Sequence, residues 1–258
     1  AYLDAGADDE RGISLPQDVV EAWLETAGWR FAELEGEGDA DPASVLAGAA
    51  DAPKTAAARA MAETVLARYA EDAQALPEAT LRELVADPSH TPARLARQCG
   101  VGLPVVFRRL AALPAEAFPD AQPRGLVACD ASGALIFRKT ISGFDLPRYG
   151  AACPLLPLFV ALQRPMQPVR QLLRMNGQND VRFLVWAFAE TLYPSGYDAP
   201  GVTESWMLII PQLGTGQSDV PLGVGTNCRI CPERACAARR EASLVGAAGA
   251  EIGTAIAR

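Results

Sequence analysis

The sequence predicts an α+β fold in which a helical N-terminal half precedes a small mixed α/β domain and a cysteine-containing helical tail. Segments with helical periodicity dominate the first 114 residues. β-rich runs punctuated by Gly and Pro follow, and three of the six cysteines then lie close together. We expect three regions: a helical linker or oligomerisation region at 1–114, an α+β domain at 115–222 and a Cys-rich tail at 223–258.

Three helices are expected near the N-terminus. Residues 15–33 carry an apolar stripe at helical spacing, and residues 54–75 are rich in Ala, which has the highest intrinsic helix propensity. A third helix is expected at 77–86, because it begins with a proline, which suits a first helical turn. The small, acidic, proline-containing stretch 34–53 is expected to be a loop.

Residues 89–113 resemble a helix-turn-helix, with LARQCGV as the first helix and its Gly turn and LPVVFRRLAAL as the second. A DNA-reading helix presents polar side chains at its start. Here residues 103–106 are apolar, so that only Arg108 and Arg109 could touch DNA. Because the surroundings are acidic, we interpret the segment as a structural helix pair, with DNA binding as the alternative.

The C-terminal half alternates strands with helices. An Asp-Ala-Ser-Gly turn between two β-rich runs predicts a hairpin at 124–141. Two further β-rich runs predict strands at 180–193 and 203–212, with PSGYDAPG as the turn between them. The remaining expectations are helices near 155–163, over the PMQPVRQLLRMN stretch (165–176) and from 232 onward, and a flexible loop at 213–222.

The net charge of −8 is distributed unevenly. Residues 1–90 hold 19 acidic and 6 basic residues, whereas residues 91–258 hold 12 acidic and 17 basic ones. The first part would therefore repel nucleic acid, and the second could attract a small anion. Only two of the 23 basic residues are Lys, and Arg suits planar anions such as phosphate and carboxylate.

The ends and the apolar runs point to an intracellular chain. No run approaches the roughly 18 apolar residues of a membrane span, so no membrane association is expected. The start, AYLDAGADDERG, is acidic, has no signal-peptide character and lacks Met. We expect a piece of a longer cytoplasmic protein, with cysteines that are reduced thiols or metal ligands.

The C-x2-C-x4-C pattern is the most specific motif of the chain. It places Cys228 and Cys231 in one tight turn and Cys236 about a helical turn further on. Three thiolates that converge on one point suit zinc or an iron–sulfur cluster. The usual zinc pattern of two CxxC turns is absent, which favours the cluster. The alternative is unliganded thiols beside a solvated, Arg-rich helical face.

A fourth ligand must come from a distant part of the chain. The one His, His90, lies in the acidic half, and the remaining cysteines are Cys99, Cys129 and Cys153. Cys99 and Cys129 fit a helix end and a strand, where cysteine is a small buried apolar residue. Cys153 sits at an irregular Gly/Pro junction, where backbone amides are free to bond to sulfur, so we predict it as the fourth ligand.

No catalytic set is visible, and we do not expect an enzyme. The chain has a single His and no HExxH, P-loop, GxGxxG or GxSxG motif. The second half does offer cations near apolar and aromatic residues, which fits an amphiphilic acid or acyl-phosphate ligand. The candidate cofactor-binding residues are Arg138, Lys139, Arg148, Arg164 and Arg170.

Three stretches resemble the C-terminal domain of the short-chain fatty acyl transcriptional regulators: GLVACDASGALIFRKTISGFDLPRYGAACPLLPLF, RFLVWAFAETLYPSGYDAPGVTESWMLIIP and VGTNCRICPERACAARREASLV. The resemblance covers about residues 115–245 and is most specific in the cysteine tail. It implies a sensor of CoA or short-chain acyl-CoA that assembles as a homo-oligomer, dimer or tetramer. It also implies control of fatty-acyl or propionate metabolism genes through an N-terminal DNA-binding domain that this chain lacks.

The resemblance further implies a [4Fe-4S] cluster. Cys228, Cys231 and Cys236 match the family's motif, and Cys153 matches the Cys of the ACPL segment. Other members carry a metallopeptidase-like region ahead of the sensor, but no HExxH is present here. Two alternatives stay open: a zinc-stapled protein-interaction module and an iron–sulfur enzyme.

Overall fold

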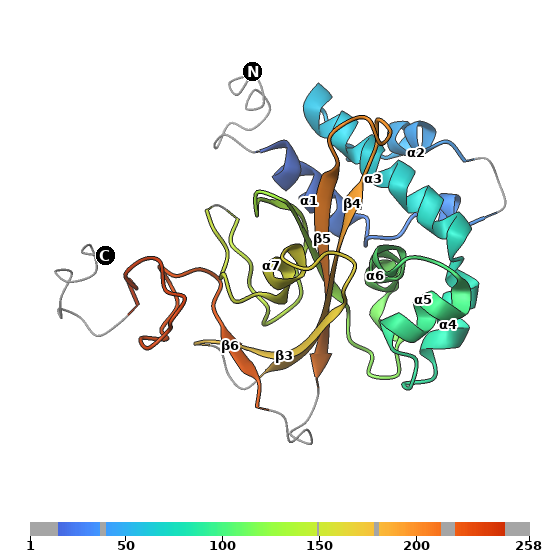
Figure 1. The fold of residues 1–258 in the computed structure, drawn as a ribbon. Coiled ribbons are helices and arrows are strands. Elements are labelled where there is room, and N and C mark those ends of the chain that lie inside the picture. Colours follow the sequence, from blue (N-terminus) through green and yellow to red (C-terminus); the bar gives the residue numbers. More distant parts are fainter. Residues whose placement is uncertain (1–14, 37–39, 149, 178–180, 213–219, 246–258) are drawn as a thin grey trace. The chain divides into compact units, whose positions relative to one another are not determined.

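The computed structural model describes residues 15–36, 40–148, 150–177, 181–212 and 220–245. The chain divides into two compact units, Ala1–Arg124 and Gly125–Arg258 (Figure 1). The stretch 115–124, which the sequence had placed with the α+β domain, thus belongs to the helical unit. No helix among these residues is long and apolar enough to cross a membrane.

Within residues 15–36 and 40–124, the regular elements of the first unit are all helices, and α3 is the longest of them. Helices α1 and α2 pack against α3, and α6 packs against α3, α4 and α5. The elements are α1 (Pro16–Thr26), η2 (Ala32–Leu34), α2 (Pro42–Gly48), α3 (Ala56–Ala75), α4 (Glu78–Val85), α5 (Pro92–Cys99), α6 (Leu103–Ala112) and η3 (Ala115–Ala117).

The expected loop at 34–53 was wrong in part, because it contains α2. The carboxylate of Asp41 accepts a hydrogen bond from the backbone N–H of Ala43 and caps the helix, and Pro42 occupies its first turn. Leu46 is completely buried. A cap and one buried side chain thus suffice for a short helix that composition alone does not signal.

The helix pair over 89–113 is confirmed. Gly100 ends α5 in the left-handed conformation (φ 68°), which favours glycine, and α6 follows directly. The two arginines that could have reached DNA are bound inside the unit. Arg108 forms an ion pair with Asp72 (2.6 Å), and Arg109 forms one with Glu35 (2.7 Å). This supports the structural interpretation of the pair.

The second unit is built on one six-stranded sheet of order β2-β1-β5-β4-β3-β6. All neighbours pair antiparallel except β3 and β6, which are parallel. The elements are β1 (Gly125–Asp130), β2 (Leu135–Lys139), α7 (Pro157–Leu162), β3 (Val169–Met175), β4 (Arg182–Leu192), β5 (Val202–Gln212) and β6 (Leu222–Val224). The expected hairpin, the helix near 155–163 and the two long strands are confirmed.

One expectation in this unit was wrong, and another differs at its end. The helix expected over 165–176 is strand β3, in which Val169, Leu173 and Met175 are buried on one face and exposed Arg170 and Arg174 lie with buried Leu172 on the other. That period of two is the strand pattern, and the preceding Pro168 is compatible with a strand start as well as a helix start. Most of the loop expected at 213–222 lies outside the described residues; residues 220 and 221 are in neither helix nor strand, and only Leu222 belongs to β6.

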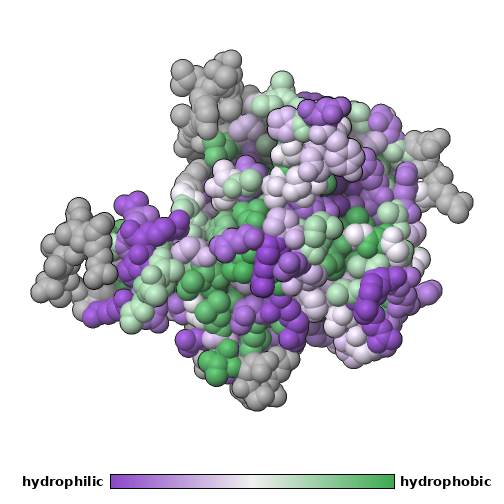
Figure 2. Space-filling model, viewed as in Figure 1, coloured by the Kyte–Doolittle hydropathy of each residue, from purple (hydrophilic) through white to green (hydrophobic). Residues whose placement is uncertain are grey.

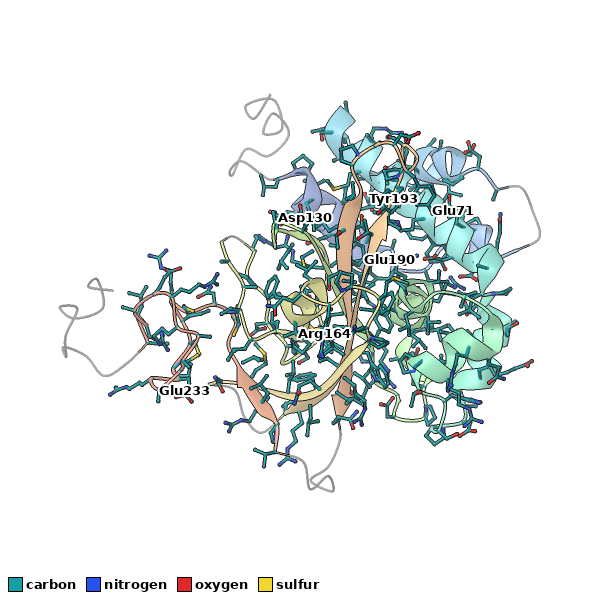
Figure 3. All side chains as sticks on the ribbon, viewed as in Figure 1. Glu71, Asp130, Arg164, Glu190, Tyr193 and Glu233 are labelled. Carbon is teal, nitrogen blue, oxygen red and sulfur yellow. The ribbon has the colours of Figure 1, made fainter. Side chains whose placement is uncertain are left out.

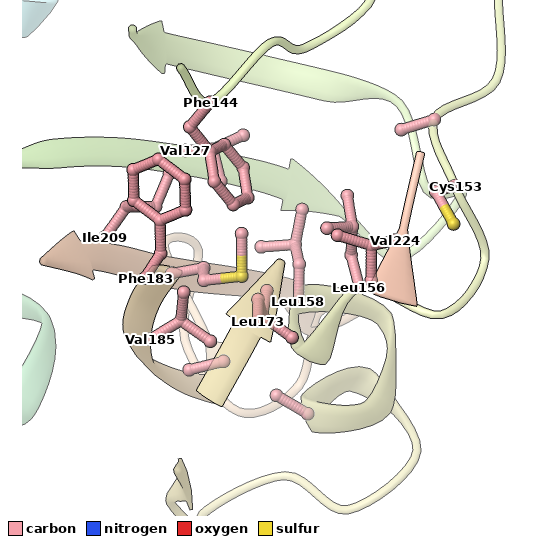
Figure 4. Packing of buried hydrophobic residues seen from close by; sticks show 14 of the residues in the cluster. Val127, Phe144, Cys153, Leu156, Leu158, Leu173, Phe183, Val185, Ile209 and Val224 are labelled. Carbon is pink, nitrogen blue, oxygen red and sulfur yellow. The ribbon is translucent and has the colours of Figure 1, made fainter. Parts of the chain in front are cut away.

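Helix α7 covers one face of the sheet and closes the main core. Val127, Leu158, Leu173 and Phe183 are all fully buried in this cluster (Figure 4). Figure 2 shows apolar surface around α7, where Phe159 and its neighbours are only partly buried. Cys153, Leu156 and Val224 lie together at one end of the core (Figure 4). This end carries the cysteine site.

The helix expected from 232 onward is absent from the described tail, which forms turns and bends through residue 245. Pro232 has no backbone N–H to donate. Carbonyl groups that a helix would bond internally instead accept from the guanidinium of Arg239, among them those of Glu233 and Glu241. The rest of the expected helix, 246–258, lies outside the described residues.

Candidate metal centre

The fold brings together three of the four predicted ligands. Cys153 lies in the irregular segment before α7, and Cys228 and Cys231 follow β6, which ends beside it. The three side chains are buried, with exposed fractions of 7–8%. The Cys153 thiol is close enough to the thiols of Cys228 and Cys231 for both to raise its pKa.

The turn that carries Cys228 and Cys231 is anchored to the sheet. The N–H of Asn176, just after β3, donates to the carbonyl of Val224 in β6 (2.7 Å). Further on, the side-chain oxygen of Asn227 accepts from the backbone N–H groups of Arg229 (3.0 Å) and Ile230 (3.2 Å). This Asx turn folds the CRIC segment so that both thiols face inward.

Gly225 occupies the tightest position of the site. A Cβ there would lie 2.8 Å from both the Cβ and the Sγ of Cys231, closer than side-chain atoms approach one another. The backbone N–H of Gly225 also bonds to the Cys153 sulfur. Glycine is therefore required by space, since its backbone fills the gap between the two cysteine segments.

Hydrogen-bond donors surround the sulfur atoms and act on them unequally. Burial raises the pKa of the Cys153 thiol, against bonds from the N–H groups of Gly225 and Leu155. Burial also acts to raise the pKa of Cys228. There, bonds from the backbone and side chain of Arg240 and the backbone of Glu241 outweigh it, so that the pKa is lowered.

Asn176 gives the third sulfur its donor, because its side-chain amide lies 3.7 Å from Cys231 Sγ. Cys236, the fourth predicted ligand, is only partly buried. It lines an open groove of about 460 Å³ that Asn176 also lines. The remaining walls are Leu155, Arg174, Gly223, Glu233, Ala235, Ala237 and Ala238. Cys236 thus shares this groove with Asn176, whose side-chain amide reaches Cys231.

The donor set fits a thiolate-bound centre. In the part of the chain that the structure describes, no three Cys, His, Asp or Glu side chains stand close enough to hold a single metal ion. A [4Fe-4S] cluster is larger than one ion, so its ligands lie further apart. Three buried thiols with N–H donors on each sulfur are the surroundings that such clusters have in proteins.

The predicted anion-binding residues do not converge on one pocket. Arg138 and Lys139 are successive residues of β2, so they point to opposite faces of the sheet. Both are buried, and Arg138 donates to the carbonyls of Pro147 (3.1 Å) and Arg148 (3.0 Å). The guanidinium of Arg138 therefore has a role in closing the loop between β2 and α7.

The other three cations are exposed and dispersed. Arg148 lies in that same loop, and Arg164 follows α7 (Figure 3). Arg170 is on β3, which is separated from β2 by three strands, or about 19 Å at the usual strand spacing. Which of the five cations contacts a ligand stays a prediction.

Sequence reasoning missed Asn176, Gly225 and Asn227. For two of them a local signal exists, because Gly225 and Asn227 immediately precede the CRIC turn, where tight turns need glycine and an Asx acceptor. Asn176 has none, since it approaches Cys231 from 55 residues away in sequence.

Comparisons with known proteins agree with this architecture. A family model described as short-chain fatty acyl coenzyme A regulator, C-terminal, matches residues 120–251. The propionyl-CoA carboxylase regulator of Cereibacter sphaeroides is 29% identical over 196 residues, which are 71% of this chain and 41% of that protein. The HTH-type transcriptional regulator PrpR of Mycobacterium tuberculosis is 28% identical over 200 residues, 70% of this chain and 39% of that protein.

The chain spans about two fifths of the length of these curated relatives. A solved structure of a Mycobacterium tuberculosis transcriptional regulator has the same fold, with a TM-score of 0.64 at 23% identity. That likeness covers 94% of this chain and 74% of the other. Because the family model covers half of the sequence, including the cysteine tail, the chain belongs to the short-chain fatty acyl coenzyme A regulator family.

Proposed function

We propose that this chain is the ligand-sensing part of a bacterial transcriptional regulator of short-chain acyl metabolism. Its effector would be CoA or a short-chain acyl-CoA, and its tail would hold a [4Fe-4S] cluster. Family membership and the names of the relatives support the regulatory role. The observation that supports the cluster is that buried Cys153 lies close to buried Cys228 and Cys231.

The cysteines of the site come from two segments, and that arrangement gives the centre a mechanical role. Cys153 belongs to the sheet's own core, whereas Cys228, Cys231 and Cys236 belong to the tail. A bound cluster would supply iron atoms that the four thiolates ligate, and it would supply one-electron redox chemistry. The thiolates would then tie the tail to the sheet, while the N–H donors of Gly225, Leu155 and Asn176 offset their charge.

In this proposal, effector binding regulates transcription by changing the arrangement of the DNA-binding domains. An effector acts through its different affinity for two states of the protein. In a homo-oligomer, dimer or tetramer, a shift of the tail would change the spacing of DNA-binding domains contributed by other parts of the full protein. Such a protein works in the cytoplasm, where its DNA and its acyl-CoA effector are found.

A regulatory role is proposed over an enzymatic one. The relatives are named as regulators, and the one histidine is engaged elsewhere. His90 lies in the helical unit, where its Nδ1 is 2.7 Å from the carbonyl oxygen of Leu84. Turnover assays with acyl-CoA substrates, run on cluster-loaded protein, would reveal catalysis if this choice is wrong.

The cluster is tested by chemical analysis of protein purified without oxygen. We expect about four iron and four sulfide per chain in the wild type and a large loss in Cys153→Ser. Cys129→Ser is the matched control, because Cys129 is also buried but lies within strand β1. One zinc per chain would favour the zinc-stapled module instead, and metal-free wild-type protein would refute the centre.

The effector is tested separately by thermal unfolding of cluster-loaded protein. CoA and propionyl-CoA at about 100 times their dissociation constants should stabilise the folded state by about 2.7 kcal/mol and raise the melting temperature. Propionate alone serves as the control for the acyl group. An unchanged melting temperature with every CoA compound would remove the sensor half of the proposal and leave the cluster in place.

A further inference from the structure

Two adjacent arginines of the tail make the bonds that shape the cysteine site. Arg239 donates to four backbone carbonyls. Its Nη1 reaches the carbonyls of Cys228 (2.9 Å) and Glu241 (3.1 Å), and its Nη2 reaches those of Cys231 (3.2 Å) and Glu233. One planar guanidinium thus bonds to both ends of the CRIC turn and to the neighbouring backbone at Glu233 and Glu241.

Arg240 connects the tail to the other cysteine segment. Its Nη2 donates to the carbonyl of Ala152 (2.6 Å), the residue before Cys153. Its side chain and backbone N–H also bond to the Cys228 sulfur. A single residue therefore contacts both halves of the site, one through a carbonyl and the other through a thiol.

Bonds of Arg239 and Arg240 end on backbone groups of the two segments that carry the thiols. The sulfur atoms of Cys153, Cys228 and Cys231 are already buried and supplied with N–H donors. Preforming a site lowers the ordering cost that binding must otherwise meet. The arginine bonds to backbone carbonyls fix the two segments that carry these thiols, whereas the ligands of small metal sites are commonly ordered by the metal itself.

We infer that Arg239 and Arg240 are positioning residues that preform the thiolate site. Arg239 shapes the turn that carries Cys228 and Cys231, and Arg240 joins that turn to the Cys153 segment. The assignment of this site to an iron–sulfur cluster rests on the proposed function, whereas the preforming of the thiols does not.

The experiment measures how fast each thiol of the metal-free protein reacts with N-ethylmaleimide, without oxygen and under native conditions, by mass spectrometry of the labelled peptides. Because the three thiols are buried, their labelling reports local opening of the tail. Arg239→Ala should raise labelling of Cys228 and Cys231 about tenfold, since four charge-assisted bonds are lost. Arg240→Ala should raise labelling of Cys153 and Cys228 by a similar factor.

Conservative variants separate positioning from simple charge. Lysine at 240 keeps a cation that can reach a single carbonyl or thiol, so Arg240→Lys should restore much of the protection. Lysine at 239 lacks the planar fork that spans four carbonyls, so Arg239→Lys should not. Arg234→Ala is the matched control, because Arg234 is exposed in the same segment and donates none of these bonds.

The outcomes distinguish this inference from the proposed function. Equal labelling in the Arg239, Arg240 and Arg234 variants would overturn the positioning role, as would wild-type thiols that react as fast as in unfolded protein. Iron and sulfide content is measured on the same proteins. A wild type that shows the expected thiol pattern but takes up no iron or sulfide would support preforming and refute the cluster.

Discussion

Arg109 in the helical unit and the Arg239–Arg240 pair in the tail differ in their main partners. In the helical unit, the buried guanidinium of Arg109 forms a double hydrogen bond with Glu35 (2.8 and 2.7 Å), and the hydroxyl of Tyr69 donates to the same carboxylate. In the tail, Arg239 and Arg240 bond to carbonyls and a thiol. The first arrangement pairs opposite charges and serves folding. The second organises thiols that remain available as ligands.

The comparison predicts that the largest effect on stability comes from the helical unit. Arg109→Met leaves the carboxylate of Glu35 without its cation and should lower the free energy of unfolding by about 3–5 kcal/mol. Urea unfolding followed by circular dichroism at 222 nm checks this. Arg97→Ala, an exposed change on α5, should stay within about 0.5 kcal/mol.

The same variant should leave the cysteine site intact. Iron and sulfide per chain in Arg109→Met, measured at a temperature where it is folded, should equal the wild-type values. A parallel loss of iron would mean that the two units are energetically coupled, so that Arg109 also affects the cysteine site. The double variant Arg109→Met with Glu35→Gln should recover part of the stability, because the unpaired charge is removed.

Alkaline pH should weaken the same network. Burial and the bond to Glu35 raise the pKa of Tyr69 to about 12, above its value of about 10 in an unfolded chain. The unfolded state therefore loses its proton first, and stability falls as pH rises from about 10 to about 12. The loss approaches about 2–3 kcal/mol at the upper end.

Tyr69→Phe isolates this contribution. The variant loses a hydrogen bond worth about 1 kcal/mol at neutral pH, but its stability should depend less on pH above about 10 than that of the wild type. Urea unfolding at pH 9, 10 and 11 gives the comparison. Identical slopes in both proteins would show that Tyr69 does not titrate as its surroundings predict.

The contrast between the units also explains what the sequence could predict. The candidate ligands can be predicted from the sequence, because three of them share a local motif and the fourth, Cys153, lies at a Gly/Pro junction. The fold brings Cys153 close to Cys228 and Cys231. The role of Arg109 cannot be predicted from the sequence. Its partner Glu35 lies 74 residues away, and an arginine on a helix carries no sign of burial.

Local ambiguity accounts for the fold errors. Strand β3 and the expected helix share a proline start, and seven residues fit either period until cross-strand pairing with β4 decides. The tail has strong helix formers, but the bonds of Arg239 to backbone carbonyls override that propensity. In both cases, tertiary partners choose the structure.

At the cysteine site, backbone space should matter more than charge. Gly225→Ala places a methyl group 2.8 Å from Cys231 Sγ, so the turn must shift and the cluster should bind about 10–100-fold more weakly. Competition with a chelator measures this. Gly48→Ala is the matched control, because a Cβ there meets nothing within 4 Å. Unchanged iron retention in Gly225→Ala would show that the turn can relax.

Of these variants, Asn227→Ala should have the smallest effect on iron retention. Asn227 supplies the acceptor for two N–H groups of the CRIC turn, on an exposed surface where water can replace it. We therefore expect about 1 kcal/mol of local destabilisation, seen as faster loss of iron to a chelator with no change in the unfolding of the helical unit. If Asn227→Ala released iron as fast as Arg239→Ala, the Asx turn and not the guanidinium would be the main organiser of the site. Because the two residues bond to different backbone groups of the same turn, the double variant then shows whether their contributions add or whether one depends on the other.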